Sequence, residues 1–146
     1  SYNPALFAGG YLQIPGTSQF SGVEATAAWE IGEGVTLEGF VTDLSSDDAN
    51  GNDLPYRPET TAQVSARYSA AKIDWLLLAR YTSDRSDGFG TRLSEYTVMD
   101  GSFRYAITDE LNVSVRAENL TNEGYSDIVG YRSAGRTFYV GLNVSI

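Results

Sequence analysis

The chain has 146 residues and a net charge of −9, and it contains no cysteine and no histidine. These absences exclude disulfides, thiolate chemistry, catalysis by Ser-His or Cys-His pairs and nearly all zinc sites. The negative charge argues against sequence-independent nucleic-acid binding, which depends on basic patches. The sequence has no run of 18 apolar residues, so only β-strands could carry this chain across a membrane.

Alternating apolar and polar residues predict about seven β-strands of roughly ten residues each. Residues 1–17 contain two prolines and a Gly-Gly pair and are predicted to be mainly loop. The alternation then covers residues 19–31, 35–44, 60–70, 73–82, 96–107, 111–118 and 135–146. No segment has the i, i+3, i+4 apolar spacing of an amphipathic helix. The sequence therefore predicts an all-β, antiparallel protein.

The connections between these strands alternate between short and long. Three-residue turns at 32–34, 70–72 and 108–110 alternate with polar loops at 45–58, 83–94 and 119–134. Long loops on one side and tight turns on the other are typical of outer-membrane barrels, whose turns are periplasmic. A soluble sandwich has no reason to sort its loops in this way. We therefore expect a transmembrane β-barrel segment with long extracellular loops and short periplasmic turns.

The two faces of the predicted strands differ in chemistry. One face carries valine, leucine, alanine and glycine, with aromatic residues towards the strand ends: Trp29, Tyr68, Trp75, Tyr81 and Tyr105. The other face carries polar and charged residues: Glu24, Glu38, Gln63, Arg67, Asp74, Arg80, Arg104, Arg116 and Glu118. This pattern predicts a lipid-facing band with aromatic girdles around a polar lumen.

Several motifs resemble those of TonB-dependent outer-membrane receptors. Residues 116–125, RAENLTNEGY, resemble the NL-x-(D/N)-x-x-Y signature near the C-terminus of these receptors. Residues 130–138, GYRSAGRTF, resemble the GY…GR segment that opens their final strand. Weaker similarities to these receptors lie upstream, at residues 21–24, 54–58 and 96–100, in the same order as in the family. The run GYRSAGR is closest to vitamin B12 receptors, and siderophore receptors are nearly as similar.

The resemblance implies a barrel of about twenty-two strands with an N-terminal plug domain. Seven is an odd number, whereas a single-chain bacterial barrel has an even number of strands. We therefore expect residues 1–146 to be one barrel segment, the C-terminal third of a larger barrel or one chain of a split one. The plug domain would lie outside this chain.

The function that the resemblance implies is import of a scarce chelate, either a corrinoid or a ferric siderophore. TonB would supply the energy, no enzymatic activity and no cofactor are expected, and the setting would be the outer-membrane lipid of a Gram-negative bacterium. The barrel-assembly machinery would recognise the last strand. The apolar face of that strand consists of Phe138, Val140, Leu142, Val144 and Ile146, although the family usually ends in phenylalanine.

Aromatic residues on the long loops are the first candidates for ligand contact. Phe89, Tyr125 and Tyr131 could stack on a flat ligand. The charges of the predicted lumen could mark a transport path, but cross-strand pairing and contacts to the plug are the favoured interpretation.

The acidic loop is a second, weaker candidate site. Its residues at positions 1, 3, 5 and 12 of a calcium-loop spacing are Asp48, Asn50, Asn52 and Glu59. Asp53 stands where that loop needs glycine, and Pro55 and Pro58 interrupt the frame. An ordinary solvated loop without metal is therefore the favoured interpretation.

Two alternatives remain open from the sequence. A small closed barrel that uses residues 2–14 as an eighth strand would be a structural or adhesive outer-membrane protein. A soluble β-sandwich would be a binding module.

Overall fold

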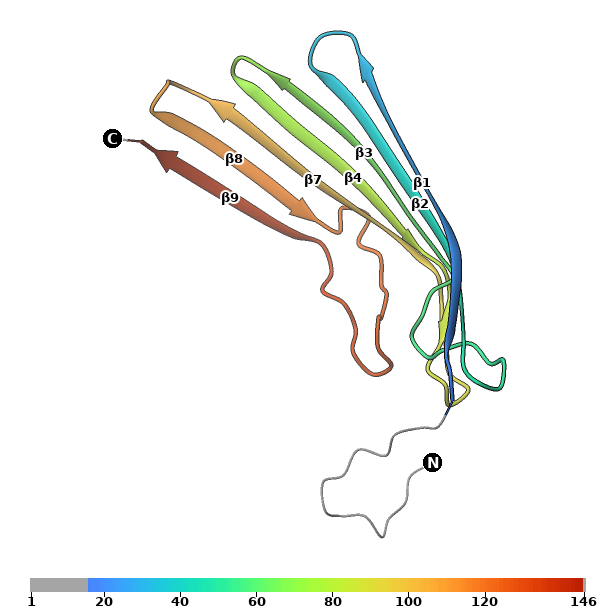
Figure 1. The fold of residues 1–146 in the computed structure, drawn as a ribbon. Coiled ribbons are helices and arrows are strands. Elements are labelled where there is room, and N and C mark those ends of the chain that lie inside the picture. The colour runs from blue at the N-terminus through green and yellow to red at the C-terminus, as the bar shows by residue number, and fades with distance from the viewer. Residues whose placement is uncertain (1–15, 146) are drawn as a thin grey trace.

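The computed structural model describes residues 16–145, which form one curved wall a single layer thick (Figure 1). Each long strand pairs antiparallel with the next long strand along the chain. The strands are β1 (Gln19–Ile31), β2 (Val35–Asp47), β3 (Thr60–Ala70), β4 (Ile73–Thr82), β7 (Tyr96–Ala106), β8 (Leu111–Glu118) and β9 (Thr137–Val144). A small separate hairpin, β5 (Arg85–Ser86) and β6 (Arg92–Leu93), lies within the connection between β4 and β7.

The seven predicted strands are confirmed, with shifted ends in three of them: β7 ends at Ala106, one residue before the predicted end, and β2 and β9 differ as follows. β2 continues to Asp47 instead of ending at Leu44, because the first residues of β1 pair with it out to the register Gln19↔Asp47. β9 begins at Thr137 rather than Gly135, because the backbone N–H of Arg136 donates to the Asn122 side chain at 3.0 Å. Ile146 lies outside the described residues.

The short and long connections lie at opposite ends of the wall, as predicted (Figure 1). In the turn between β1 and β2, Gly32 and Gly34 have φ angles of 60° and 86°, which favour glycine. A Cβ atom on Gly34 would lie 2.6 Å from the carbonyl oxygen of Ser69. The turn therefore needs glycine both for its backbone conformation and for its approach to β3.

The strand register separates an apolar face from a polar face, because residues directly opposite each other point to the same side. One transverse row of the apolar face is Leu77, Gly101, Ala117 and Phe138. Many side chains on this face are exposed in the single sheet, and Val140 reaches 77 %. Tyr68 and Trp75 stack on it near the turn end, with ring centroids 6.1 Å apart. These properties are those of a lipid-facing surface with an aromatic boundary.

Little hydrophobic core exists in the described part of the chain. Only Leu93, Val98 and Ala117 are buried hydrophobic residues there. A β-sandwich buries the facing sides of two packed sheets, whereas the long strands described here form one sheet. The sandwich alternative therefore does not fit. The proposed eighth strand at residues 2–14 lies outside the described residues. Residues 16–145 contain no helix long and apolar enough to span a membrane.

Candidate functional site

The three long loops meet at one end of the wall and form the first part of the site. They are the first long loop (residues 48–59), the second long loop (83–95) and the third long loop (119–136). The backbone N–H of Tyr56 donates to the carbonyl of Ser86 at 2.8 Å, so the first loop rests on the second. The loops are therefore in contact with one another and do not extend separately.

Arg85 joins the second loop to the third, and the sequence pattern gave no signal for it. Its Nη2 donates to the carbonyl of Ser126 at 3.0 Å and to Oδ1 of Asp127 at 2.7 Å. Its Nη1 donates to the carbonyl of Ser83 at 3.5 Å. The Arg85 side chain is only 3 % exposed. A buried arginine in a loop requires such partners, because an unpaired buried charge is very costly.

Two tyrosines reinforce this junction. The Tyr96 hydroxyl donates to Oδ1 of Asp127 at 2.7 Å, and the Arg85 guanidinium lies 5.5 Å from the centre of the Tyr96 ring. Tyr125 stacks on Tyr96 with ring centroids 4.1 Å apart. One face of the Tyr125 ring is therefore occupied by packing, which leaves less of it for the ligand contact that the sequence predicted.

Phe89 and Tyr131 are displayed openly on the loops. Phe89 is 95 % exposed at the tip between β5 and β6, and Tyr131 is 75 % exposed. Oδ1 of Asp87 accepts the backbone N–H groups of Phe89 at 2.7 Å and Thr91 at 3.0 Å, so the tip that carries Phe89 is held by hydrogen bonds. These two aromatic side chains are placed to meet a ligand, and this role stays a prediction.

The two hydrogen bonds that the Asp87 carboxylate accepts, here called the Asp87 cap, lead to a pH-dependent prediction. The backbone N–H of Phe89, and then that of Thr91, hold the pKa of Asp87 below its usual value. A depressed carboxyl pKa stabilises the tip above the unfolded-state pKa, and this stabilisation is lost as pH falls through the lowered pKa. We expect Asp87→Ala to accelerate amide exchange at Phe89 and Thr91 at neutral pH, as measured by hydrogen exchange. Asp87→Asn should change less, because it keeps an acceptor; equal effects of the two variants would contradict the cap.

The acidic loop is organised around Asp48. Its Oδ1 accepts the backbone N–H groups of Asn50 at 2.8 Å and Asn52 at 2.9 Å. The Asn52 side-chain amide also donates to both carboxylate oxygens, at 3.3 and 3.2 Å. These donors, with the Asn52 backbone first, lower the pKa of Asp48. Asn52 thus turns its N–H₂ group, rather than its oxygen, towards Asp48. Among the described residues, no group of three or more acidic side chains is arranged to hold a metal ion.

We expect calcium to give no binding heat when titrated into the purified protein. The Asp48 carboxylate already accepts four hydrogen bonds within its own loop, and the loop lacks the glycine that a calcium loop needs at its sixth position. Isothermal titration calorimetry tests this, with magnesium as the matched control. Heat that is specific to calcium and lost in Glu59→Gln would contradict the prediction.

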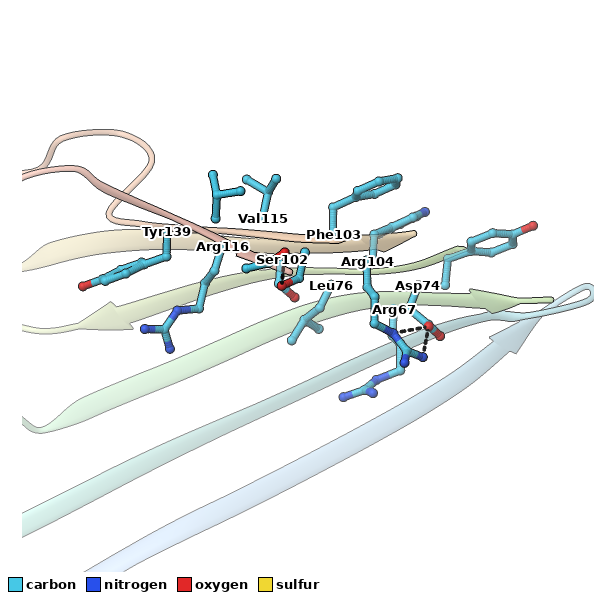
Figure 2. A pocket seen from close by; sticks show the side chains of 14 residues that line it. Arg67, Asp74, Leu76, Ser102, Phe103, Arg104, Val115, Arg116 and Tyr139 are labelled. Carbon is cyan, nitrogen blue, oxygen red and sulfur yellow. Dashed lines mark hydrogen bonds and ion pairs between the residues drawn. The ribbon is translucent and has the colours of Figure 1, made fainter. Parts of the chain in front are cut away.

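The inner, polar face of the wall forms the second part of the site. One transverse row is Arg67, Leu76, Ser102, Arg116 and Tyr139. Figure 2 shows the Arg67, Arg116 and Tyr139 side chains on one side of the sheet, and Phe103 and Val115 on the other. Together with Asp74 and Arg104, residues of both faces line a hollow at this level of the wall.

The charged residues of this face pair largely with one another. Arg80 Nη2 lies 2.6 Å from Asp100 Oδ2 on the neighbouring strand. Arg104 donates from Nε to Oδ2 of Asp74 at 3.0 Å, and from Nη2 to the same oxygen (Figure 2). The cross-strand pairing that the sequence favoured is thus present for Arg80 and Arg104.

Arg116 makes two different contacts on this face. Its guanidinium lies 3.2 Å from Glu118 on its own strand and 4.5 Å from the ring centre of Tyr139 on β9. Both partners of the Arg116 guanidinium are therefore residues of the wall itself.

Two residues of the recognised motifs anchor the third loop. Asp100, the last residue of the family similarity at 96–100, accepts the backbone N–H of Asn119 at 2.9 Å. Asn119, in the NL motif, is buried with a φ angle of 52°. Its Nδ2 donates to the carbonyls of Glu123 at 2.9 Å and Ala134 at 3.2 Å, and its Oδ1 accepts the Glu123 N–H at 2.8 Å. The motifs pointed to these residues, but the sequence did not indicate their roles.

Comparison with known proteins places this chain among outer-membrane receptors. The model of the family described as "TonB dependent receptor-like, beta-barrel" matches residues 2–120. The vitamin B12 transporter BtuB of Vibrio cholerae serotype O1 is 30 % identical over 140 residues, which cover 90 % of this chain and 23 % of the relative. BtuB of Vibrio vulnificus is 28 % identical over 127 residues, 85 % of this chain and 20 % of the relative. This chain thus spans less than a quarter of the length of these curated relatives.

Solved structures of outer-membrane receptors contain a similar arrangement of strands. The ferric-catecholate import receptor Fiu of E. coli K12 matches with a TM-score of 0.74 and 25 % identity, over 88 % of this chain and 21 % of that receptor. The ferripyoverdine receptor of the outer membrane of Pseudomonas aeruginosa matches with a TM-score of 0.78 and 19 % identity, over 98 % and 21 %. The predicted antiparallel barrel segment is therefore confirmed as the fold.

Proposed function

This chain belongs to the TonB-dependent receptor-like β-barrel family, and we propose that it forms the C-terminal third of the barrel of an active transporter for a scarce chelate. Its location is the outer membrane of a Gram-negative bacterium. The described residues supply seven strands of wall and three long loops on one side. The plug domain and the remaining strands would come from other residues of the same receptor or from a separate chain.

The observation that carries this proposal is the combination of an outward apolar face with a cluster of loops that displays Phe89 and Tyr131. The first suits a wall in lipid, and the second suits capture of a flat ligand outside the cell. The names of two relatives suggest the cargo: vitamin B12 for BtuB and a ferric catecholate for Fiu. A corrinoid or a ferric siderophore is therefore the proposed ligand class.

The inner face suits a plug that must move. Arg104 is paired with Asp74, and Arg80 with Asp100, within the wall itself. When TonB displaces the plug, these charges keep their partners, because both members of each pair belong to the wall. The proposed partners of the chain are thus TonB, the plug, outer-membrane lipid and the barrel-assembly machinery. The last of these would recognise β9 through its apolar face, Phe138, Val140, Leu142 and Val144, together with Ile146.

Uptake measurements on cells test the proposal. Deletion of the gene for the full receptor should abolish TonB-dependent uptake of either radiolabelled cyanocobalamin or a radioiron-loaded catecholate siderophore, and a plasmid copy should restore it. Phe89→Ala combined with Tyr131→Ala should weaken binding of that ligand about tenfold, which corresponds to a loss of about 1.4 kcal/mol of stacking. Asp109→Ala in a turn at the opposite end is the matched control. Unchanged uptake of both ligands in the deletion strain would refute the proposed cargo class.

A further inference from the structure

Arg85 differs from the other arginine of its hairpin in how completely it is enclosed. The Arg85 side chain is 3 % exposed, whereas that of Arg92, paired with Asp84 at 2.5 Å, is 77 % exposed. Arg85 also donates to acceptors on two loops, while the Arg92 pair stays within the second long loop. Burying a guanidinium is costly unless its hydrogen bonds are satisfied, so the contacts of Arg85 hold it firmly in one position.

Each of the two loops is closed by its own hydrogen bonds. The Asp87 carboxylate closes the tip of the second loop. In the third loop, Ser133 N–H donates to the Tyr125 carbonyl at 2.9 Å, and Asn119 holds the base. The tip of the second loop can therefore keep its shape without the third loop, whereas Ser126 and Asp127 of the third loop are held from outside, by Arg85 and Tyr96. What remains to be fixed is how the two loops are placed relative to one another.

The hydrogen bonds from Arg85 to Ser126 and Asp127 are the only ones that join the second and third long loops among residues 16–145. They are supported by Tyr96, whose hydroxyl donates to the same oxygen of Asp127 and whose ring stacks on Tyr125. Asp127 itself is 63 % exposed, so its carboxylate gains little from packing. The hydrogen bonds between the two loops therefore all come from one arginine, and Tyr96 at the start of β7 adds its own contacts to the third loop.

We propose that Arg85 is a positioning residue that latches the second and third long loops into one unit. The latch sets the separation of Phe89 and Tyr131 and keeps the third loop seated against the second. This inference rests on the proposed function only in treating these loops as the ligand-facing side. The coupling itself is a property of the receptor without ligand and can be measured without one.

Hydrogen exchange of the ligand-free full receptor in lipid nanodiscs tests the latch. Arg85→Gln is expected to accelerate amide exchange in residues 123–133 at least tenfold, while residues 87–91 and the long strands change little. Asp127→Asn should have a similar effect, and the double variant should add little to either single one, because both remove the same contact. Tyr96→Phe, which keeps the ring and Arg85, should have a smaller effect.

Arg92→Gln is the matched control and should leave residues 123–133 unchanged. The proposal is overturned if Arg85→Gln and Asp127→Asn leave exchange there unchanged, if their effects simply add, or if Arg92→Gln does the same. Should Arg85→Gln fail to fold, Asp127→Asn and Tyr96→Phe decide the question, since Asp127 is exposed and the Tyr96 ring is retained. Because no ligand is present, failure of the latch is distinguishable from failure of the proposed cargo.

Discussion

Leu77→Lys is expected to lower the free energy of unfolding of the receptor by about 2–4 kcal/mol, because it places a charge in the middle of the lipid-facing surface. Leu77 lies near the centre of β4, on the apolar face and in one row with Gly101, Ala117 and Phe138. Bilayer hydrocarbon cannot solvate an ammonium group, and the cost is largest near the midplane. Urea unfolding in phospholipid vesicles, followed by tryptophan fluorescence, measures the loss.

Leu78→Lys is the matched control for this prediction, since it changes the same residue type in the same strand. Leu78 points to the inner face, opposite Asp100 and Ser65 in the register. A lysine there faces the lumen and gains a carboxylate neighbour, so its loss in stability should be less than half of that at Leu77. Equal losses at both positions would contradict the assignment of the apolar face to lipid.

Asn119→Ala is expected to release the third long loop at a cost of about 2–4 kcal/mol in its local stability. The change removes the partners of the Glu123 N–H and of the Glu123 and Ala134 carbonyls. It also places alanine at a φ angle of 52°, a conformation that costs L-residues about 1–2 kcal/mol. Asn119 links the start of the third long loop, at Glu123, to its end, at Ala134. Without these links the whole loop should become mobile while the wall stays folded.

Limited trypsin digestion of whole cells measures this release, because Arg132 offers a cleavage site inside the loop. Cleavage after Arg132 should be much faster in Asn119→Ala than in the wild type. Asn119→Gly, which tolerates the positive φ but loses the same hydrogen bonds, should give an intermediate rate. Cleavage that is as slow in both variants as in the wild type would show that Asn119 does not close the loop.

The strands, their two faces and the sorting of the loops could all be read from the residues in order. A period of two sends successive side chains to opposite faces, so the sides of β4 and β9 are set by local alternation. Glycine-containing and three-residue connections force a strand to return at once, as between β1 and β2. These are short-range effects, and neighbouring residues carry enough information to predict them.

The contacts that organise the loops join residues far apart in the chain. Arg85 meets Asp127 across 42 positions, and Arg80 meets Asp100 across 20. No local pattern marks Arg85 as buried and Arg92 as exposed, although both lie in the same hairpin. The sequence predicts a ligand contact at Tyr125 because it is an aromatic residue on a long loop, whereas the fold stacks it on Tyr96.

Local alternation therefore settled the wall of this protein: seven strands, an apolar outer face and a polar inner one, with long loops at one end. Only the tertiary structure decided which loop residues hold the site together. Those contacts depend on the sheet register, which brings together strand ends that are far apart in the sequence. The register places Thr82, the last residue of β4, opposite Tyr96, the first residue of β7. That adjacency allows Arg85, Tyr96 and the third long loop to meet.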